Sequence, residues 1–128
     1  MTPAARGRYA IGLGRPKVPG SVTSEPLLVL TTCESSSQAQ ELADALVSSR
    51  LAACVNTVDS VSSTYRWAGK VERGKEFLLL IKTTEERLEA IEERIKTLSA
   101  YDLPEVVAVR IQSGSSDYLD WLGSSVRE

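Results

Sequence analysis

Two cysteines are the only side chains that could act as thiolate nucleophiles or soft metal ligands, and the 128 residues include no histidine to join them. Cys33 closes an apolar run that begins at Leu27, and Cys54 opens a stretch in which valine recurs. Copper and zinc sites prefer thiolate together with imidazole, and acid–base catalysis near neutral pH commonly relies on histidine. We therefore expect both thiols to be reduced, buried core residues, and we expect the protein not to be an enzyme.

Two charged residues flank residues 77–81, the longest apolar run in the chain. Glu76 and Lys82 would share one face of a strand but lie too far apart to pair, since a strand rises about 3.3 Å per residue. One interpretation, which we favour, is that both are strand-end charges neutralised at an interface. The other is that Lys82 holds an anion in a cleft between subunits. The candidate residues of that inter-subunit cleft are Lys82, Tyr101, Glu105 and Glu76.

The distribution of charge argues against nucleic-acid binding. The first 24 residues carry four of the 15 basic side chains and no acid, so the remainder holds 11 basic residues against all 17 acidic ones. Phosphate backbones require clustered lysine and arginine. The acids between residues 85 and 93 lack the spacing of a calcium-binding loop and indicate a solvated helix face. Because no apolar run is long enough to span a bilayer, we expect neither nucleic acid nor membrane as a partner.

Seven predicted elements must position these side chains. Strands are predicted over residues 27–32, 53–67, 71–82 and 105–111, and helices over residues 35–49, 83–98 and 116–122. Residues 35–38 and 83–86 have the spacing of capping boxes, which open helices. The second and third strands would form a long hairpin that reverses near residues 68–70. We expect a bulge near Asp59 and Ser60 and an irregularity at Gly74.

The order β-α-β-β-α-β, followed by a last helix, predicts an α+β, ferredoxin-like fold with an antiparallel sheet and two helices on one face. Residues 77–81 are apolar on both faces, so one apolar set must lie on the face without helices. Exposed apolar surface of this kind marks an interaction site. Together with the overlong hairpin it predicts a homo-oligomer. The aromatic residues that we expect to anchor its interfaces are Tyr65, Trp67 and Trp121.

The N-terminal segment differs in composition from this domain. Residues 1–25 contain three prolines, four glycines and no periodic apolar pattern. This predicts a disordered or variable tail, followed by one domain over residues 26–128. An arginine-rich leader without acids over residues 1–24 is also compatible with organelle targeting, which remains the alternative to a cytoplasmic location.

Five strings of residues carry a family resemblance. They are LAACVN at 51–56, YRWAGK at 65–70, EFLLLIKTT at 76–84, PE at 104–105 and YLDWL at 118–122. In this order and spacing they resemble the CutA family of divalent-cation tolerance proteins, over about residues 27–127. The resemblance implies a ferredoxin-like fold and a homotrimer in which the long hairpin links neighbouring subunits. It also implies a response to divalent metal ions such as copper.

The resemblance also suggests where a metal would bind. The candidate ligands in the family are a histidine in a His-Pro-Tyr-Glu stretch and, in some members, a cysteine near the end of the first strand. Here that stretch reads SAYD at residues 99–102, and Cys33 lies two residues beyond the family's cysteine position, which Thr31 occupies. The remaining candidate metal ligands are Cys33, Asp102 and Glu105. We expect no tightly bound cofactor, and only weak, carboxylate-based binding of copper or another divalent cation.

The leading hypothesis is therefore a cytoplasmic, CutA-like homotrimer that takes part in the response to metal ions. The alternative is a small-molecule sensing or signalling module without metal function, similar to the PII proteins, whose trimeric ferredoxin-like plan the predicted fold resembles. A third interpretation is a structural protein whose trimer core serves as a scaffold.

Overall fold

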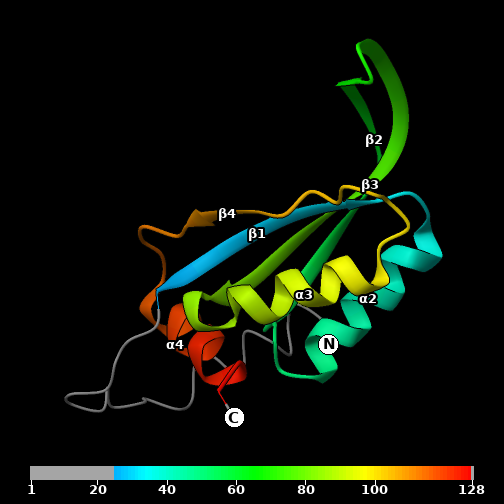
Figure 1. Cartoon of the computed structure of the whole chain (residues 1–128). Coiled ribbons are helices and arrows are strands. Elements are labelled where there is room, and N and C mark those ends of the chain that lie inside the picture. The colour runs from blue at the N-terminus through cyan, green and yellow to red at the C-terminus, as the bar shows by residue number, and fades with distance from the viewer. Residues whose placement is uncertain (1–24, 128) are drawn as a thin grey trace.

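The structure, a computed structural model, describes residues 25–127 and contains a four-stranded sheet with helices across one face (Figure 1). Its elements are β1 (Pro26–Cys33), α2 (Ser36–Ser48), β2 (Cys54–Trp67), β3 (Lys70–Thr84), the 3-10 turn η1 (Glu85–Arg87), α3 (Leu88–Leu98), β4 (Val107–Arg110) and α4 (Ser116–Ser125). The strand order is β2-β3-β1-β4, and each neighbouring pair is antiparallel. This confirms the predicted α+β, ferredoxin-like fold.

The predicted N-terminal tail lies outside the described residues, apart from Glu25. Within residues 25–127, no helix combines the length and the apolar character needed to cross a lipid bilayer.

The core lies between the two central strands and the helices. Side chains alternate across a strand, and along β1 every second residue, from Leu27 to Cys33, is buried. The register sets Val29 opposite Ile81 on β3, and both are fully buried. The helices close this layer with five buried side chains: Ala39, Leu42, Leu46, Ile91 and Ile95. Along each helix these residues recur at three- or four-residue intervals, which is the spacing of one helix face.

The two capping-box predictions have different outcomes. Ser35 caps α2, because its hydroxyl accepts a hydrogen bond from the Gln38 N–H at 3.1 Å. The box at residues 83–86 is wrong: Thr84 precedes η1 without a side-chain cap. The Thr83 hydroxyl instead donates to the Leu51 carbonyl at 2.7 Å. Because the Thr83 hydroxyl bonds to a residue distant in sequence, it does not cap the helix, and the chain enters α3 through the 3-10 turn η1.

The long hairpin projects beyond the sheet as an arm, defined here as residues 61–76 (Figure 1). The predicted bulge is confirmed by a register shift between Val58 and Val61, where Ser60 has a positive φ of 57°. The predicted irregularity at Gly74 is wrong, because Gly74 pairs in register with Ser63. At the tip, Ala68 and Gly69 both have positive φ, as a two-residue hairpin turn with the twist of its strands requires.

The C-terminal elements differ in their bounds from the prediction. β4 spans Val107–Arg110 and not residues 105–111, because only these four residues pair with β1, and α4 extends to Ser125 and not to residue 122. Helix α4 is capped by Ser115, whose hydroxyl accepts from the Tyr118 N–H at 3.3 Å, and not by Ser116. Within α4 only Leu122 is buried, and the C-cap residue Val126 is buried as well. The helix lies beside the start of β1 (Figure 1).

The sheet face opposite the helices, called here the open face, is apolar and lacks a covering layer within the described chain. Cross-strand partners share a face, so the register alone builds its rows. One row runs Asn56, Leu80, Leu30 and Val107, and the next runs Cys54, Lys82, Leu28 and Val109. The exposed fractions of Val107 and Val109 are 48% and 53%. The expectation that one apolar set of β3 lies on the face without helices is thus confirmed.

Candidate functional site

A network of hydroxyls surrounds Glu76 where the arm leaves the sheet. The Tyr101 hydroxyl donates to the Glu76 carboxylate at 2.8 Å, and the Ser63 and Thr32 hydroxyls donate to it as well. Burial raises the pKa of Glu76, but these three hydrogen bonds outweigh it and hold the pKa below 4.5. The carboxylate is therefore ionised at neutral pH and satisfied by its own chain. We call these four residues the arm-base network.

Tyr101 reaches this position from the loop that follows α3. Its backbone N–H donates to the Ser99 hydroxyl at 3.0 Å, which fixes the start of the loop. Burial raises the pKa of Tyr101, and the hydrogen bond to Glu76 and the charge of that carboxylate raise it further. The phenol is thus a permanent donor. The sequence analysis placed Glu76 and Tyr101 among the candidates for a cleft between subunits and did not predict their contact within one chain. It gave no signal for Thr32 or Ser63, since serine and threonine are common in strands.

The three candidate metal ligands do not form a site within the chain. Cys33 is buried with 3% of its surface exposed, and burial, with the nearby charge of Glu76, raises the pKa of its thiol to about 11. Asp102 and Glu105 are exposed on the loop between α3 and β4. Among the described residues, no group of three histidine, cysteine, aspartate or glutamate side chains is close enough to hold a metal ion.

Lys82 lies near the C-terminal end of β3, away from the arm-base network. It is six positions after Glu76, which corresponds to about 20 Å along a strand. Its ammonium group sits over the ring of Tyr118, 5.8 Å from the centroid, and Tyr118 in turn contacts Trp121 with 5.4 Å between ring centroids. A single chain therefore does not bring Lys82 to Tyr101. Whether the two meet across a subunit boundary stays a prediction.

The thiols also lie apart, as expected. β3 separates the strands of Cys33 and Cys54, and neither cysteine forms a disulfide. Cys54 is partly exposed on the open face, where it is the cross-strand partner of Lys82. Its thiol lies 3.7 Å from the Asn56 side-chain oxygen.

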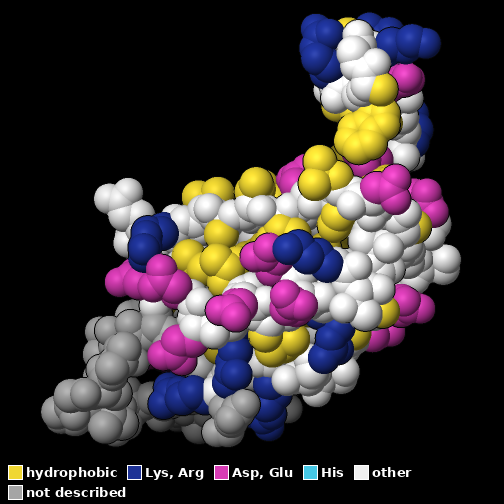
Figure 2. Space-filling view, viewed as in Figure 1, with side chains coloured by type: hydrophobic (Ala, Val, Ile, Leu, Met, Phe, Trp, Pro, Cys, Tyr) yellow, Lys and Arg dark blue, Asp and Glu magenta, His cyan; other side chains and the backbone are white. Residues whose placement is uncertain are grey.

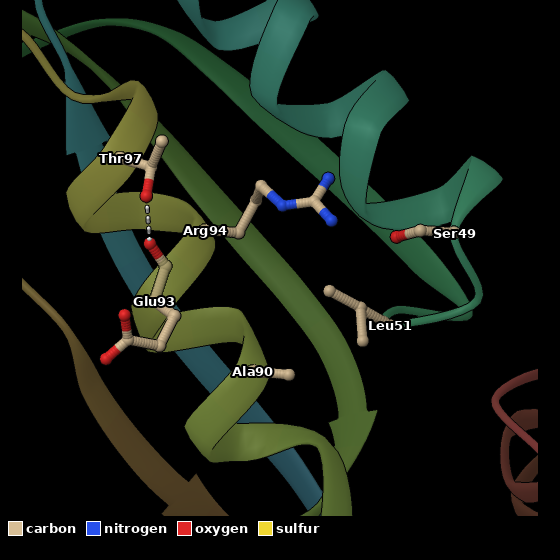
Figure 3. A pocket seen from close by; sticks show the side chains of 6 residues that line it. All are labelled: Ser49, Leu51, Ala90, Glu93, Arg94 and Thr97. Carbon is tan, nitrogen blue, oxygen red and sulfur yellow. Dashed lines mark hydrogen bonds between the residues drawn. The ribbon is translucent and has the colours of Figure 1, made fainter.

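A groove between the end of α2 and the outer side of α3 was not predicted from the sequence (Figure 3). It encloses about 440 Å³ and is lined by Ser49, Leu51, Ala90, Glu93, Arg94 and Thr97. Figure 3 shows the Arg94 guanidinium reaching from α3 towards Ser49, whereas the Glu93 carboxylate points away from it. The carboxyl end of a helix carries partial negative charge, so Arg94 complements the end of α2. These residues are scattered in the chain, and no sequence pattern joins them.

The predicted interface anchors differ in exposure. Tyr65 and Trp67 lie on the arm with exposed fractions of 48% and 49%. Trp121, in α4, is partly buried. Figure 2 shows the arm standing clear of the rest of the molecule, with hydrophobic side chains at its base and basic ones towards its tip. The two arm aromatics thus present large amphipathic surfaces that the described chain does not cover.

Comparison with known proteins places this fold and these residues in one family. The family model described as "CutA1 divalent ion tolerance protein" matches residues 27–125. The "Divalent-cation tolerance protein CutA" of Thermus thermophilus is 48% identical over 95 residues, which cover 74% of this chain and 92% of that protein. The "Protein CutA 1, chloroplastic" of Oryza sativa is 43% identical over 108 residues, which cover 84% of this chain but only 61% of the rice protein.

Solved structures agree. The crystal structure of CutA1 from Oryza sativa superposes with a TM-score of 0.80 at 42% identity, covering 84% of this chain and 99% of that one. The divalent cation tolerance protein of Thermus thermophilus superposes with a TM-score of 0.78 at 45% identity, covering 80% and 99%. The resemblance seen in the five strings is confirmed, and the chain belongs to the CutA1 divalent ion tolerance family.

Proposed function

We propose that this protein acts in divalent-cation tolerance as a homotrimer, with only weak metal binding of its own. The observation that supports self-association is a single continuous surface. Glu76 and Leu78 have the same parity along β3, so the side of the arm that carries Tyr65 and Trp67 continues the open face. Apolar surface of this extent is costly to leave in water and marks an interface. A neighbouring copy with the same surface would cover it.

The size of the trimer and its dependence on this surface are both measurable. Light scattering during size exclusion should give three times the 13.9 kDa chain mass. Leu80→Asp places a charge in the middle of the open face and should shift the protein towards monomer. The control is Leu103→Asp, at a side chain that is 74% exposed on a loop. A wild-type monomer at micromolar concentration would refute the proposal.

Weak metal binding follows from the chemistry of the donors. Metal binds the thiolate, not the thiol, so a pKa of about 11 disfavours coordination by Cys33 at neutral pH. Asp102 and Glu105 offer carboxylates, which suit hard cations better than copper or zinc. We expect calorimetric titrations with Cu(II), Cu(I) and Zn(II) to show weak binding that Asp102→Asn with Glu105→Gln removes. Cys33→Ser separates a thiol contribution. Tight binding that survives all three substitutions would contradict the carboxylate site.

The cleft between subunits is the second element of the proposal. In a trimer, Lys82 of one copy would approach Glu76, Tyr101 and Glu105 of a neighbour and form an anion-binding or cation-binding pocket there. Lys82→Ala and Tyr101→Phe would then change the binding of any small molecule that co-purifies with the trimer. An oligomer whose subunit boundary lies far from both residues would overturn this assignment.

Location and catalysis complete the proposal. We assign the protein to the cytoplasm. We give it no catalytic role, because the family description names ion tolerance and no reaction. Two relatives carry the word chloroplastic in their names, and a solved relative from Archaeoglobus fulgidus is called periplasmic. Imaging of the full chain against a variant that lacks residues 1–24 tests the location directly. Retention in an organelle only when residues 1–24 are present would overturn the cytoplasmic assignment.

A further inference from the structure

The arm has two faces of different chemistry, which follow from its register. On one face, Tyr65 pairs with Glu72 and Trp67 pairs with Lys70. On the other face, Arg66 pairs with Val71, Thr64 with Arg73, and Ser62 with Lys75. The second face, called here the cationic face, consists of Ser62, Thr64, Arg66, Val71, Arg73 and Lys75, and all six are exposed. It carries three cations and no acid.

The three cations of this face have no ion-pair partner in the described part of the chain. Among residues 25–127, none of Arg66, Arg73 and Lys75 forms an ion pair. Adjacent cross-strand rows lie about 7 Å apart along a ribbon, so three like charges repel one another unless an anion lies across them. The hydroxyls of Ser62 and Thr64 stand beside the cations and add donors. This combination is suited to a ligand with regularly spaced negative charges.

The cationic face points away from the proposed assembly surface. Arg73 and Lys75 have the parity of the β3 residues that face the helices, and Tyr65 and Trp67 continue the open face. A neighbour packed on the open face would therefore leave the cationic face accessible. This step rests on the proposed trimer.

The overall charge of the domain conceals the separation of the basic residues on the arm from the acidic residues elsewhere. Residues 62–75 hold four basic residues and one acid, whereas the rest of residues 25–128 holds seven basic residues and 16 acids. The arm extends past the sheet by about seven residues per strand, roughly 23 Å. Charges are screened over about 8 Å at physiological ionic strength. The acidic body therefore does not cancel the field at the tip, where basic side chains gather in Figure 2.

We propose that the cationic face binds the phosphate backbone of duplex nucleic acid without sequence specificity. A two-stranded β-ribbon is one of the two elements that fit the major groove, and arginine, lysine, serine and threonine are the usual donors to phosphate oxygens. The cationic face carries no aromatic side chain on which an unpaired base could stack, and this favours duplex over single strands. The expectation of no nucleic-acid partner used the summed charge of the domain and did not consider how basic and acidic side chains are distributed within it.

The test is fluorescence anisotropy of the full-length chain with a labelled duplex DNA of about two helical turns, measured over a series of salt concentrations. Each phosphate contact contributes about 0.9 to the salt slope of the binding constant. Arg66→Gln with Arg73→Gln should lower that slope by about 1.8 and weaken binding roughly 60-fold at 0.1 M salt. The matched control, Arg94→Gln with Lys96→Gln on α3, removes two cations elsewhere and should leave binding unchanged.

Three outcomes would overturn the inference. They are no binding in low salt, equal binding by the arm variant and wild type, and competition by polyglutamate as effective as competition by DNA. The second would assign binding to basic residues outside the arm, and the third would assign the face to an acidic protein partner. Light scattering on the same samples separates this test from the proposed function. A trimer that does not bind DNA refutes only the inference, and a wild-type monomer refutes the trimer.

Discussion

Removal of the Tyr101 hydroxyl should destabilise the protein by about 1.5 kcal/mol at neutral pH. Hydrogen bonds to charged acceptors contribute about 1.5 to 3 kcal/mol, and Glu76 is only partly buried and keeps two other donors in Tyr101→Phe. The lower end of that range therefore applies. The matched control is Ser62→Ala, which removes a hydroxyl from an exposed side chain on the arm face that points away from the proposed assembly surface and should change stability by less than about 0.5 kcal/mol.

The effect should depend on pH in a direction fixed by Glu76. Its pKa in the folded state lies below the ordinary value of 4.5, so ionised Glu76 adds stability above that value, and this stability is lost as the pH falls through the folded pKa. The difference between wild type and Tyr101→Phe should be largest at pH 7 and shrink below about pH 4.5. Urea unfolding at one fixed protomer concentration measures it, because assembly links stability to concentration. A difference that stays constant or grows in acid would refute the role given to the carboxylate.

Three further predictions concern the core, the turn and a thiol. Ile81→Ala should lower the free energy of unfolding, measured in urea, by about 2 to 5 kcal/mol, since the side chain is fully buried. Leu103→Ala should leave that free energy almost unchanged, and equal losses in the two variants would contradict the assignment of Ile81 to the core. Ala68→Asn should raise stability by up to about 1 kcal/mol, because Ala68 has φ 51° and asparagine tolerates that conformation better; a loss in the same assay would show that the turn is not strained. Cys33, with a thiol pKa of about 11, should resist disulfide reagents in the native protein at pH 8 and react on unfolding. Comparison with Cys33→Ala identifies its share of the labelling, and rapid labelling of Cys33 in the native protein would contradict its burial.

The sequence was most informative where a periodic pattern met an uninterrupted core. The three- and four-residue spacing of apolar residues in α2 and α3 predicted which of their side chains are buried, because burial depends on the same spacing that the sequence displays. In β1, by contrast, residues 27–30 are all apolar, and the alternation of buried side chains became visible only in the structure. The bulge before Val61 was also predictable, since an overlong strand must bend or twist to remain paired. Prediction was wrong at Thr83 and Gly74, where a partner distant in sequence decides the local structure. The Leu51 carbonyl accepts a hydrogen bond from the Thr83 hydroxyl, and cross-strand pairing with Ser63 keeps Gly74 in register.

The candidate site was less predictable for the same reason. Glu76 was singled out as a charge beside the apolar run and Tyr101 as a candidate for the inter-subunit cleft, and the structure joins the two by a hydrogen bond within one chain. Thr32 and Ser63 complete that network from two other strands. Neither has a local signal, because their role depends on the pairing of strands that are separate in sequence. The two faces of the arm likewise required the register, since Arg66 and Tyr65 are adjacent in sequence and point in opposite directions.

The chain thus combines the fold of a cation-tolerance family with a donor set that is poor in metal ligands. It has no histidine, its most buried thiol holds its proton to about pH 11, and its best-placed carboxylate, Glu76, already accepts three hydrogen bonds. To bind a metal ion within one subunit, Glu76 would have to lose the hydroxyl donors that lower its pKa. The chemistry of the single chain therefore directs the search for a ligand towards surfaces that assembly completes, namely the boundary of the open face and the arm. A role in tolerance that depended on tight coordination inside one subunit would require a cluster of ligands that residues 25–127 do not bring together.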